Sequence, residues 1–161
     1  KRLELTDRPA MSRNETARYT ELLPDGMARA FTFEMGVKSL ITRPSCSTSL
    51  PGPGFVEISG VAWSGAGRIE RVEISTDGGE HWEQAALDGP SLPQMFTRFR
   101  FPWRFDGGAA VLKSRATDET GAIQPERAAL IDARGRHGYF HYNAIVAYEV
   151  AEDGYVSHVY A

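Results

Sequence analysis

The segment 98–105 alternates between arginines and large aromatic side chains, and this pattern limits the possible folds more than any other feature. The aromatic positions are Phe99, Phe101, Trp103 and Phe105, and the basic positions between them are Arg98, Arg100 and Arg104. Side chains two residues apart share one face of a β-strand. The pattern therefore predicts a strand with one buried face and one charged face. Pro102 cannot donate a ladder hydrogen bond, so we expect this strand to lie at a sheet edge or to bend there.

Short segments of similar character recur along the chain, and glycine-rich turns separate them. The candidate strands are residues 31–35, 55–63, 69–75, 81–87, 110–117, 139–150 and 155–160. The turn at residues 77–79 suits a hairpin because glycine accepts the positive φ that tight turns require. Residues 16–23 offer at most a marginal turn, so no segment is convincing as a helix. The sequence predicts an all-β fold, an antiparallel β-sandwich.

The composition is that of one globular domain. The chain has 161 residues, 42% hydrophobic and 24% charged, which argues against disorder. The expected core is Val56, Ile58, Trp63, Val72, Ile74, Trp82, Phe99, Phe101, Trp103, Leu112 and Ile145.

The net charge of −3 argues against general nucleic-acid binding, and no apolar run approaches the roughly 20 residues of a membrane span. The single cysteine excludes a disulfide framework and a multi-cysteine metal site built from this chain alone.

The composition and hydrophobic pattern of the chain change near residue 44. Residues 1–30 are polar and have no lasting period, while residues 44–54 are rich in proline, serine and glycine, as linkers are. We therefore expect residues 44–161 to form the sandwich and residues 1–43 to be an irregular segment that packs against something else. The chain begins at Lys1 without an initiator methionine, so we expect a mature form or a piece of a longer protein.

Few side chains are spaced for catalysis or metal binding. His137 and His141 have the spacing of a helical metal pair, but a strand would hold them about 13 Å apart. Surface or hydrogen-bonded histidines are therefore the plainer interpretation. Cys46 lies in the proline- and serine-rich loop with no histidine nearby in the sequence, which favours an unreactive thiol. The sequence assigns no catalytic residue and no metal ligand.

The arginines are the most ambiguous feature. Those of segment 98–105 share one strand face, which is either simply solvated or a basic patch for an acidic partner or an anion. Arg134 and Arg136 concentrate positive charge before the last strands, and planar guanidinium groups suit oxyanions such as sulfite or phosphate. The residues alone are more typical of an interaction module than of an enzyme with its own active site.

Longer motifs resemble the C-terminal dimerisation domain of sulfite oxidase-type molybdenum enzymes. These motifs are residues 64–82, residues 114–121 followed by Gln124-Pro125, and the entry segment 37–44. Within that family, the chain is most similar to the branch of the molybdenum subunit of bacterial sulfane dehydrogenase. The residues that carry this similarity are 18–20, 96–103 and 141–145. Together the motifs cover nearly the whole chain.

The resemblance implies an immunoglobulin-like β-sandwich that forms a homodimer, preceded in residues 1–43 by the end of a catalytic domain and a linker. It also implies that this catalytic domain, in the same polypeptide but outside this chain, binds molybdenum-molybdopterin through a cysteine thiolate. Electrons would pass to a c-type cytochrome, and the enzyme would be periplasmic. The chain contains none of the motifs of the cofactor-binding domain, and Cys46 does not match the metal-ligand cysteine.

One site residue carries over from the resemblance. In sulfite oxidases, an arginine in an Arg-Gly pair after the Gln-Pro motif helps to line the anionic substrate pocket. Arg134-Gly135 holds this place within a one-residue offset. Residues 136–139 depart from the sulfite oxidase pattern, so a structural role for Arg134 stays an equal alternative. The alternative to the whole assignment is a free-standing immunoglobulin-like binding or structural module without catalysis.

Overall fold

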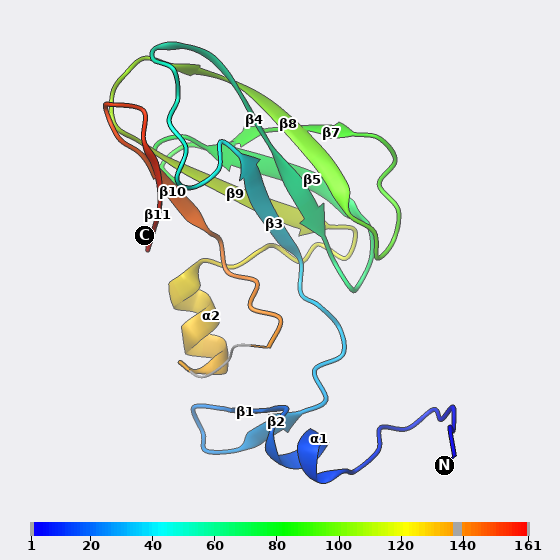
Figure 1. The fold of residues 1–161 in the computed structure, drawn as a ribbon. Helices are drawn as coiled ribbons and strands as arrows, with labels where there is room; N and C mark the ends of the chain where they lie inside the picture. The colour runs from blue at the N-terminus through cyan, green and yellow to red at the C-terminus, as the bar shows by residue number, and fades with distance from the viewer. Residues whose placement is uncertain (1, 137–139, 161) are drawn as a thin grey trace.

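The computed structural model describes residues 2–136 and 140–160, and most of its strands form two sheets packed face to face (Figure 1). One sheet has the order β3 (Lys38–Arg43), β4 (Gly54–Trp63), β8 (Thr97–Phe105), β7 (Ala86–Asp88). The other has the order β11 (Val156–Val159), β10 (Ala147–Val150), β9 (Ala110–Asp118), β5 (Ile69–Ser75), β6 (Glu83–Gln84). All strand pairs within both sheets are antiparallel. The predicted all-β antiparallel sandwich is therefore confirmed.

Strand β8 has the two faces that its alternation predicts. Its aromatic residues point into the core, where Phe99 is 0% exposed, and its arginines lie on the exposed face. β8 is a central strand, paired along its length with β4. However, β7 pairs only with residues 98–100, so Pro102 lies beyond that partner. The proline thus occupies a stretch of β8 that is open on the β7 side, where its missing N–H costs little.

The core between the sheets contains six of the predicted residues: Ile58, Val72, Ile74, Phe99, Phe101 and Leu112. It also contains residues that were not predicted, among them Ile41, Ile69, Phe105 and Val150. Ile145 is buried as predicted, but outside this cluster. Val56 and Trp103 are half-buried and pack against the core. Two predictions were wrong: Trp63 lies on the outward row of β4, five positions from the inward Ile58, and stacks edge-on against Phe96. Trp82 lies outside the five-stranded sheet, where its ring contacts the guanidinium of Arg115.

The predicted return strand 81–87 is divided between the two sheets. β6 pairs with β5, whereas β7 pairs with β8 in the opposite layer. The change of layer occurs at Ala85, which is 3% exposed and donates its N–H to the carbonyl of Val72 at 2.9 Å. Alternation cannot reveal such a change of sheet, because the backbone stays extended on both sides of it.

A helix forms between β9 and β10, although the sequence predicted no convincing helix. α2 (Arg127–Arg134) follows Pro125 and ends at Gly135, whose φ is 77°. Good helix formers between a proline and a glycine are the signal that the period-2 analysis missed. α2 buries Leu130. No helix in the described part of the chain is long and apolar enough to cross a membrane.

The N-terminal segment carries a small sheet of its own. The short helix α1 (Arg13–Ala17) leads into β1 (Thr20–Leu22), which pairs with β2 (Ala28–Ala30). This segment lies apart from the sandwich, below it in Figure 1, and residues 31–37 connect the two. The predicted strand 31–35 does not form. Phe31 has a φ of 60°, which interrupts an extended backbone.

The sandwich begins before residue 44. β3 pairs with β4, and its Ile41 is 2% exposed in the shared core. A buried amide also holds β3 against β9: Gln124 Oε1 accepts from the N–H and hydroxyl of Ser39 at 2.8 and 2.7 Å and from the N–H of Ala116 at 3.2 Å. The last residues of the segment 1–43 are therefore part of the sheet.

Candidate functional site

Arg134 is the one residue that the sequence suggested for substrate binding, and the structure places it at the end of α2, facing the N-terminal segment. Its Nε donates to Glu21 Oε2 at 3.1 Å, and its Nη2 donates to Glu21 Oε1. The Arg134 side chain is 12% exposed and the Glu21 side chain 0%. A buried carboxylate needs such a partner, because an unpaired charge is expensive to remove from water.

The same ion pair organises the loop that follows α2. Arg134 Nη1 donates to the carbonyl of His141 at 3.4 Å, and Nη2 also donates to the carbonyl of Phe140. The N–H of Phe140 in turn donates to Glu21 Oε1 at 2.9 Å. His141 has a φ of 50°, an uncommon conformation for a residue other than glycine. The ion pair thus fixes a turn of the backbone that the chain would rarely adopt alone.

A hollow of about 360 Å³ opens beside this turn. Its walls come from three segments of the chain: α1 with the turn after it, the connection after β2, and the loop at residues 140–141. The residues around it are Glu15, Tyr19, Phe31, Thr32, Phe33, Phe140 and His141. The rings of Tyr19 and Phe140 have centroids 5.7 Å apart. The hollow therefore lies at the junction between the N-terminal segment and the sandwich, next to the buried ion pair.

The other candidates from the sequence were the pair His137 and His141 and the thiol of Cys46. His137 lies outside the described residues. His141 lines the hollow, and its Nδ1 lies 3.3 Å from the backbone carbonyl oxygen of Glu34. Cys46 is exposed in the loop after β3. Among the described residues, this thiol belongs to no cluster of three potential metal ligands.

One group of potential metal ligands in the described residues was not anticipated from the sequence. The ligand atoms of Asp77, Glu80 and His81 lie within 4.8 Å of one another on an exposed hairpin turn. The Asp77 carboxylate already has local donors there, since it accepts the backbone N–H of His81 at 3.0 Å and the hydroxyl of Ser75 at 2.7 Å. These bonds explain the group as a turn motif of the kind that aspartate forms.

The electrostatics of that turn follow from the same bonds. The N–H of His81 and the hydroxyl of Ser75 hold the pKa of Asp77 well below its usual range. The hydrogen bond to Asp77 raises the pKa of His81, because a nearby carboxylate favours the protonated imidazole. The turn is exposed. The shifted pKa values therefore reflect the local contact between Asp77 and His81, and they do not mark a catalytic centre.

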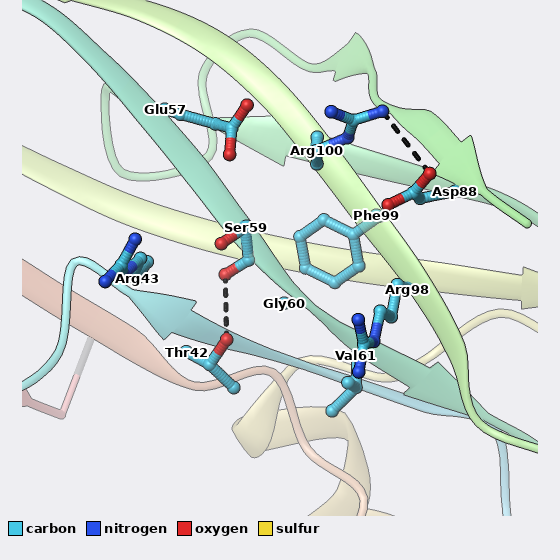
Figure 2. A pocket seen from close by; sticks show the side chains of 10 residues that line it. All are labelled: Thr42, Arg43, Glu57, Ser59, Gly60, Val61, Asp88, Arg98, Phe99 and Arg100. Atoms are coloured by element: carbon cyan, nitrogen blue, oxygen red, sulfur yellow. Dashed lines mark hydrogen bonds and ion pairs between the residues drawn. The ribbon is translucent and has the colours of Figure 1, made fainter.

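The exposed face of the four-stranded sheet is the second surface with concentrated charge (Figure 2). Arg98 and Arg100 of β8 surround a shallow hollow of about 490 Å³ together with Arg43, Glu57 and Asp88. Arg100 Nη2 is 3.3 Å from Asp88 Oδ1. The predicted common face of the strand's arginines is confirmed. The carboxylates of neighbouring strands share this face, so its charge is mixed.

On the opposite outer face, on the five-stranded sheet, Arg71 and Arg115 both pair with the carboxylate of Glu73. Arg115 Nε donates to Glu73 Oε2 at 2.9 Å, and its guanidinium lies 4.3 Å from the ring centroid of Trp82. The hydrogen bond from Arg115 lowers the pKa of Glu73. This cross-strand cluster is absent from the sequence-based candidates because its members lie in segments that are far apart in the chain.

A family model described as the Mo-co oxidoreductase dimerisation domain matches residues 29–148. The chain belongs to this family. The matched residues contain strands of both sheets and α2 with Arg134, and they end within β10. The resemblance seen in the sequence motifs is confirmed.

Known relatives of this Mo-co dimerisation domain are parts of much longer enzymes. The nitrate reductase [NADH] of Hordeum vulgare is 36% identical, with 58% of this chain and 12% of its own length covered. The sulfite oxidase of Gallus gallus is 33% identical, with 61% and 22% covered. The crystal structure of the sulfane dehydrogenase SoxCD from Paracoccus pantotrophus is similar with a TM-score of 0.91 and 47% identity, over 95% of this chain and 40% of that chain. The chain therefore spans less than half the length of each.

Proposed function

We propose that this chain is the C-terminal dimerisation part of a molybdopterin-dependent oxidoreductase that oxidises a sulfur compound, of the sulfane dehydrogenase or sulfite oxidase type. One observation carries the proposal: the 47% identity to the sulfane dehydrogenase extends over 95% of the chain. The nitrate reductase and sulfite oxidase relatives cover only 58% and 61% of it. The similarity to the sulfane dehydrogenase thus includes most of residues 1–28, which lie outside the match to the family model.

The cofactor is proposed to lie in a catalytic domain that precedes residue 1 in the same polypeptide. Residues 1–43 then form the end of that domain and the linker, with β3 already joined to the sandwich, and residues 44–161 form the rest of the dimerisation domain. The described residues do not suit the cofactor, because their one thiol, Cys46, is exposed and belongs to no cluster of three potential metal ligands among them. We therefore assign no cofactor ligand in this chain.

The partners follow from the same proposal. The sandwich joins two copies of the polypeptide into a homodimer, and the family description as a dimerisation domain supports this. Electrons leave the molybdenum centre to a c-type cytochrome, and the enzyme works in the periplasm. These two statements rest on the similarity to the sulfane dehydrogenase alone.

Arg134 is proposed to line the anionic substrate pocket from the side of the dimerisation domain. It lies beside the hollow at the junction of the N-terminal segment and the sandwich. Its guanidinium is held by Glu21 and two backbone carbonyls. One guanidinium N–H has no acceptor among the described residues and stays available for an oxyanion.

The proposal is tested on the full-length protein. We expect purified enzyme to contain molybdenum in stoichiometric amount and to oxidise sulfite, or thiosulfate bound to a protein cysteine, with a one-electron acceptor. Nitrate reduction with a reduced dye serves as the control, because nitrate reductases share this domain. Molybdenum-free protein, or activity confined to nitrate, would contradict the proposal and favour a binding module or the other branch.

A further inference from the structure

The carboxylate of Glu21 is the most completely enclosed charge in the described part of the chain. It is 0% exposed, and all its hydrogen bonds reach residues more than 110 positions away. Its three donors are Nε and Nη2 of Arg134 and the backbone N–H of Phe140. Two parallel bonds between a carboxylate and a guanidinium fix direction as well as distance. The position of Arg134 therefore depends on Glu21.

We propose that Glu21 is a positioning residue for substrate binding, acting through Arg134 and the loop at residues 140–141. This inference rests on the proposed function, in which Arg134 lines the substrate pocket. Glu21 itself is buried behind Arg134 and has no exposed surface with which to touch a substrate.

The hydrogen bonds of the Arg134 guanidinium show how Glu21 positions it. A guanidinium has five N–H groups. One goes from Nε to Glu21, two from Nη2 go to Glu21 and the Phe140 carbonyl, and one from Nη1 goes to the His141 carbonyl. The second N–H of Nη1 has no acceptor among the described residues. Glu21 thus determines which edge of the guanidinium remains free for an anion.

Glu21 also sets the electrostatic strength of this arginine. A bidentate carboxylate balances the guanidinium charge, so Arg134 offers an anion one directed hydrogen bond and only a small net field. The arrangement favours orientation of the substrate over strong attraction. Removing the negative charge would leave Arg134 more attractive to anions in general but free to turn away from the site.

Glu21 also affects the hollow indirectly, through the backbone of residues 140–141. The carboxylate holds the N–H of Phe140, and Phe140 and His141 both line the hollow. His141 has a φ of 50°, which persists only where its surroundings impose it. The loss of Glu21 should therefore loosen this wall of the hollow together with Arg134.

The test uses the full-length holoenzyme with sulfite as the probe. We expect Glu21→Gln to raise KM about tenfold while kcat changes less than about twofold. Glu149→Gln, an exposed carboxylate on β10, is the matched control and should leave both constants unchanged. Backbone hydrogen exchange of a peptide covering residues 140–146 should become faster in Glu21→Gln and stay unchanged in the control. Molybdenum content and thermal unfolding are measured on the same samples.

A double-mutant cycle with Arg134→Ala separates this inference from the proposed function. If Glu21 acts through Arg134, Glu21→Gln adds little to the KM of the Arg134→Ala enzyme. A rise in KM for Arg134→Ala but not for Glu21→Gln, or full additivity, would overturn the role of Glu21 and leave the role of Arg134 standing. An unchanged KM in Arg134→Ala would refute the substrate role itself. If Glu21→Gln does not fold, Glu21→Asp keeps the charge and should give a smaller rise in KM, and an unchanged KM there overturns the inference.

Discussion

Replacing Gly60 by alanine is expected to destabilise the sandwich by about 3 kcal/mol or more. Gly60 lies on the inward row of β4, between Ile41 of β3 and Phe99 of β8. A Cβ atom at this position would lie 2.2 Å from the carbonyl oxygen of Leu40 and 2.4 Å from Cζ of Phe99. The first contact is with backbone that the sheet holds in place, so no change of rotamer can relieve it. Strand β3 would have to move away from β4.

The measurement is equilibrium unfolding of the chain in denaturant. Ser59→Ala is the matched control, since Ser59 is next to Gly60 and points to the other face of β4, and it should change the free energy of unfolding by less than about 0.5 kcal/mol. A loss below about 1 kcal/mol for Gly60→Ala would mean that β3 and β8 are not packed against β4 as described.

Replacing Gln124 by leucine is expected to cost about 3 kcal/mol, because it leaves several buried polar groups without partners. Gln124 is 2% exposed. Its amide oxygen accepts hydrogen bonds from Ser39 and Ala116, and its amide nitrogen donates to the carbonyl of Ala144. These groups belong to β3, β9 and the segment before β10. Leucine has a similar volume but offers neither a donor nor an acceptor, so the desolvated N–H and hydroxyl groups would remain unsatisfied.

Gln84→Leu provides the control for this substitution. Gln84 is exposed on the edge strand β6, and its replacement should leave the free energy of unfolding within about 0.5 kcal/mol of the parent. Equal stabilities of Gln124→Leu and the parent would show that the amide is not the buried connection between β3 and β9.

The sequence predicted the sandwich well where a strand keeps one face in the core. The alternation of residues 98–105 placed Phe99 and Phe101 inside and Arg98 and Arg100 outside, because the pleat of a strand imposes that period. It failed where a tertiary feature interrupts the period. The layer change at Ala85 and the left-handed backbone of Phe31 leave no mark on hydrophobic spacing.

The site was less predictable for a related reason. Arg134 was identified through the family resemblance, but its partner Glu21 lies 113 positions earlier in a segment without a regular period. Neither composition nor spacing links two such residues. The buried contact arises only when the N-terminal segment packs against the end of α2, so a single sequence contained no signal for it.

The fold alone leaves the chemistry undecided. Relatives of this domain include proteins named as nitrate reductases and as sulfite oxidases, which perform different reactions with the same attached sandwich. Function therefore depends on the sites joined to a fold, and not on the fold itself. The property that the domain's own structure should supply in each case is the association of two copies.

Sedimentation equilibrium of the 161-residue chain tests this central claim most directly. The account predicts a species of twice the 17.8 kDa chain mass, because the sandwich carries the dimer contact by itself. The full-length enzyme should likewise contain two copies of the polypeptide. A single 17.8 kDa species at the highest soluble concentration, together with a monomeric full-length protein, would contradict the assignment of this sandwich as a dimerisation domain in the protein.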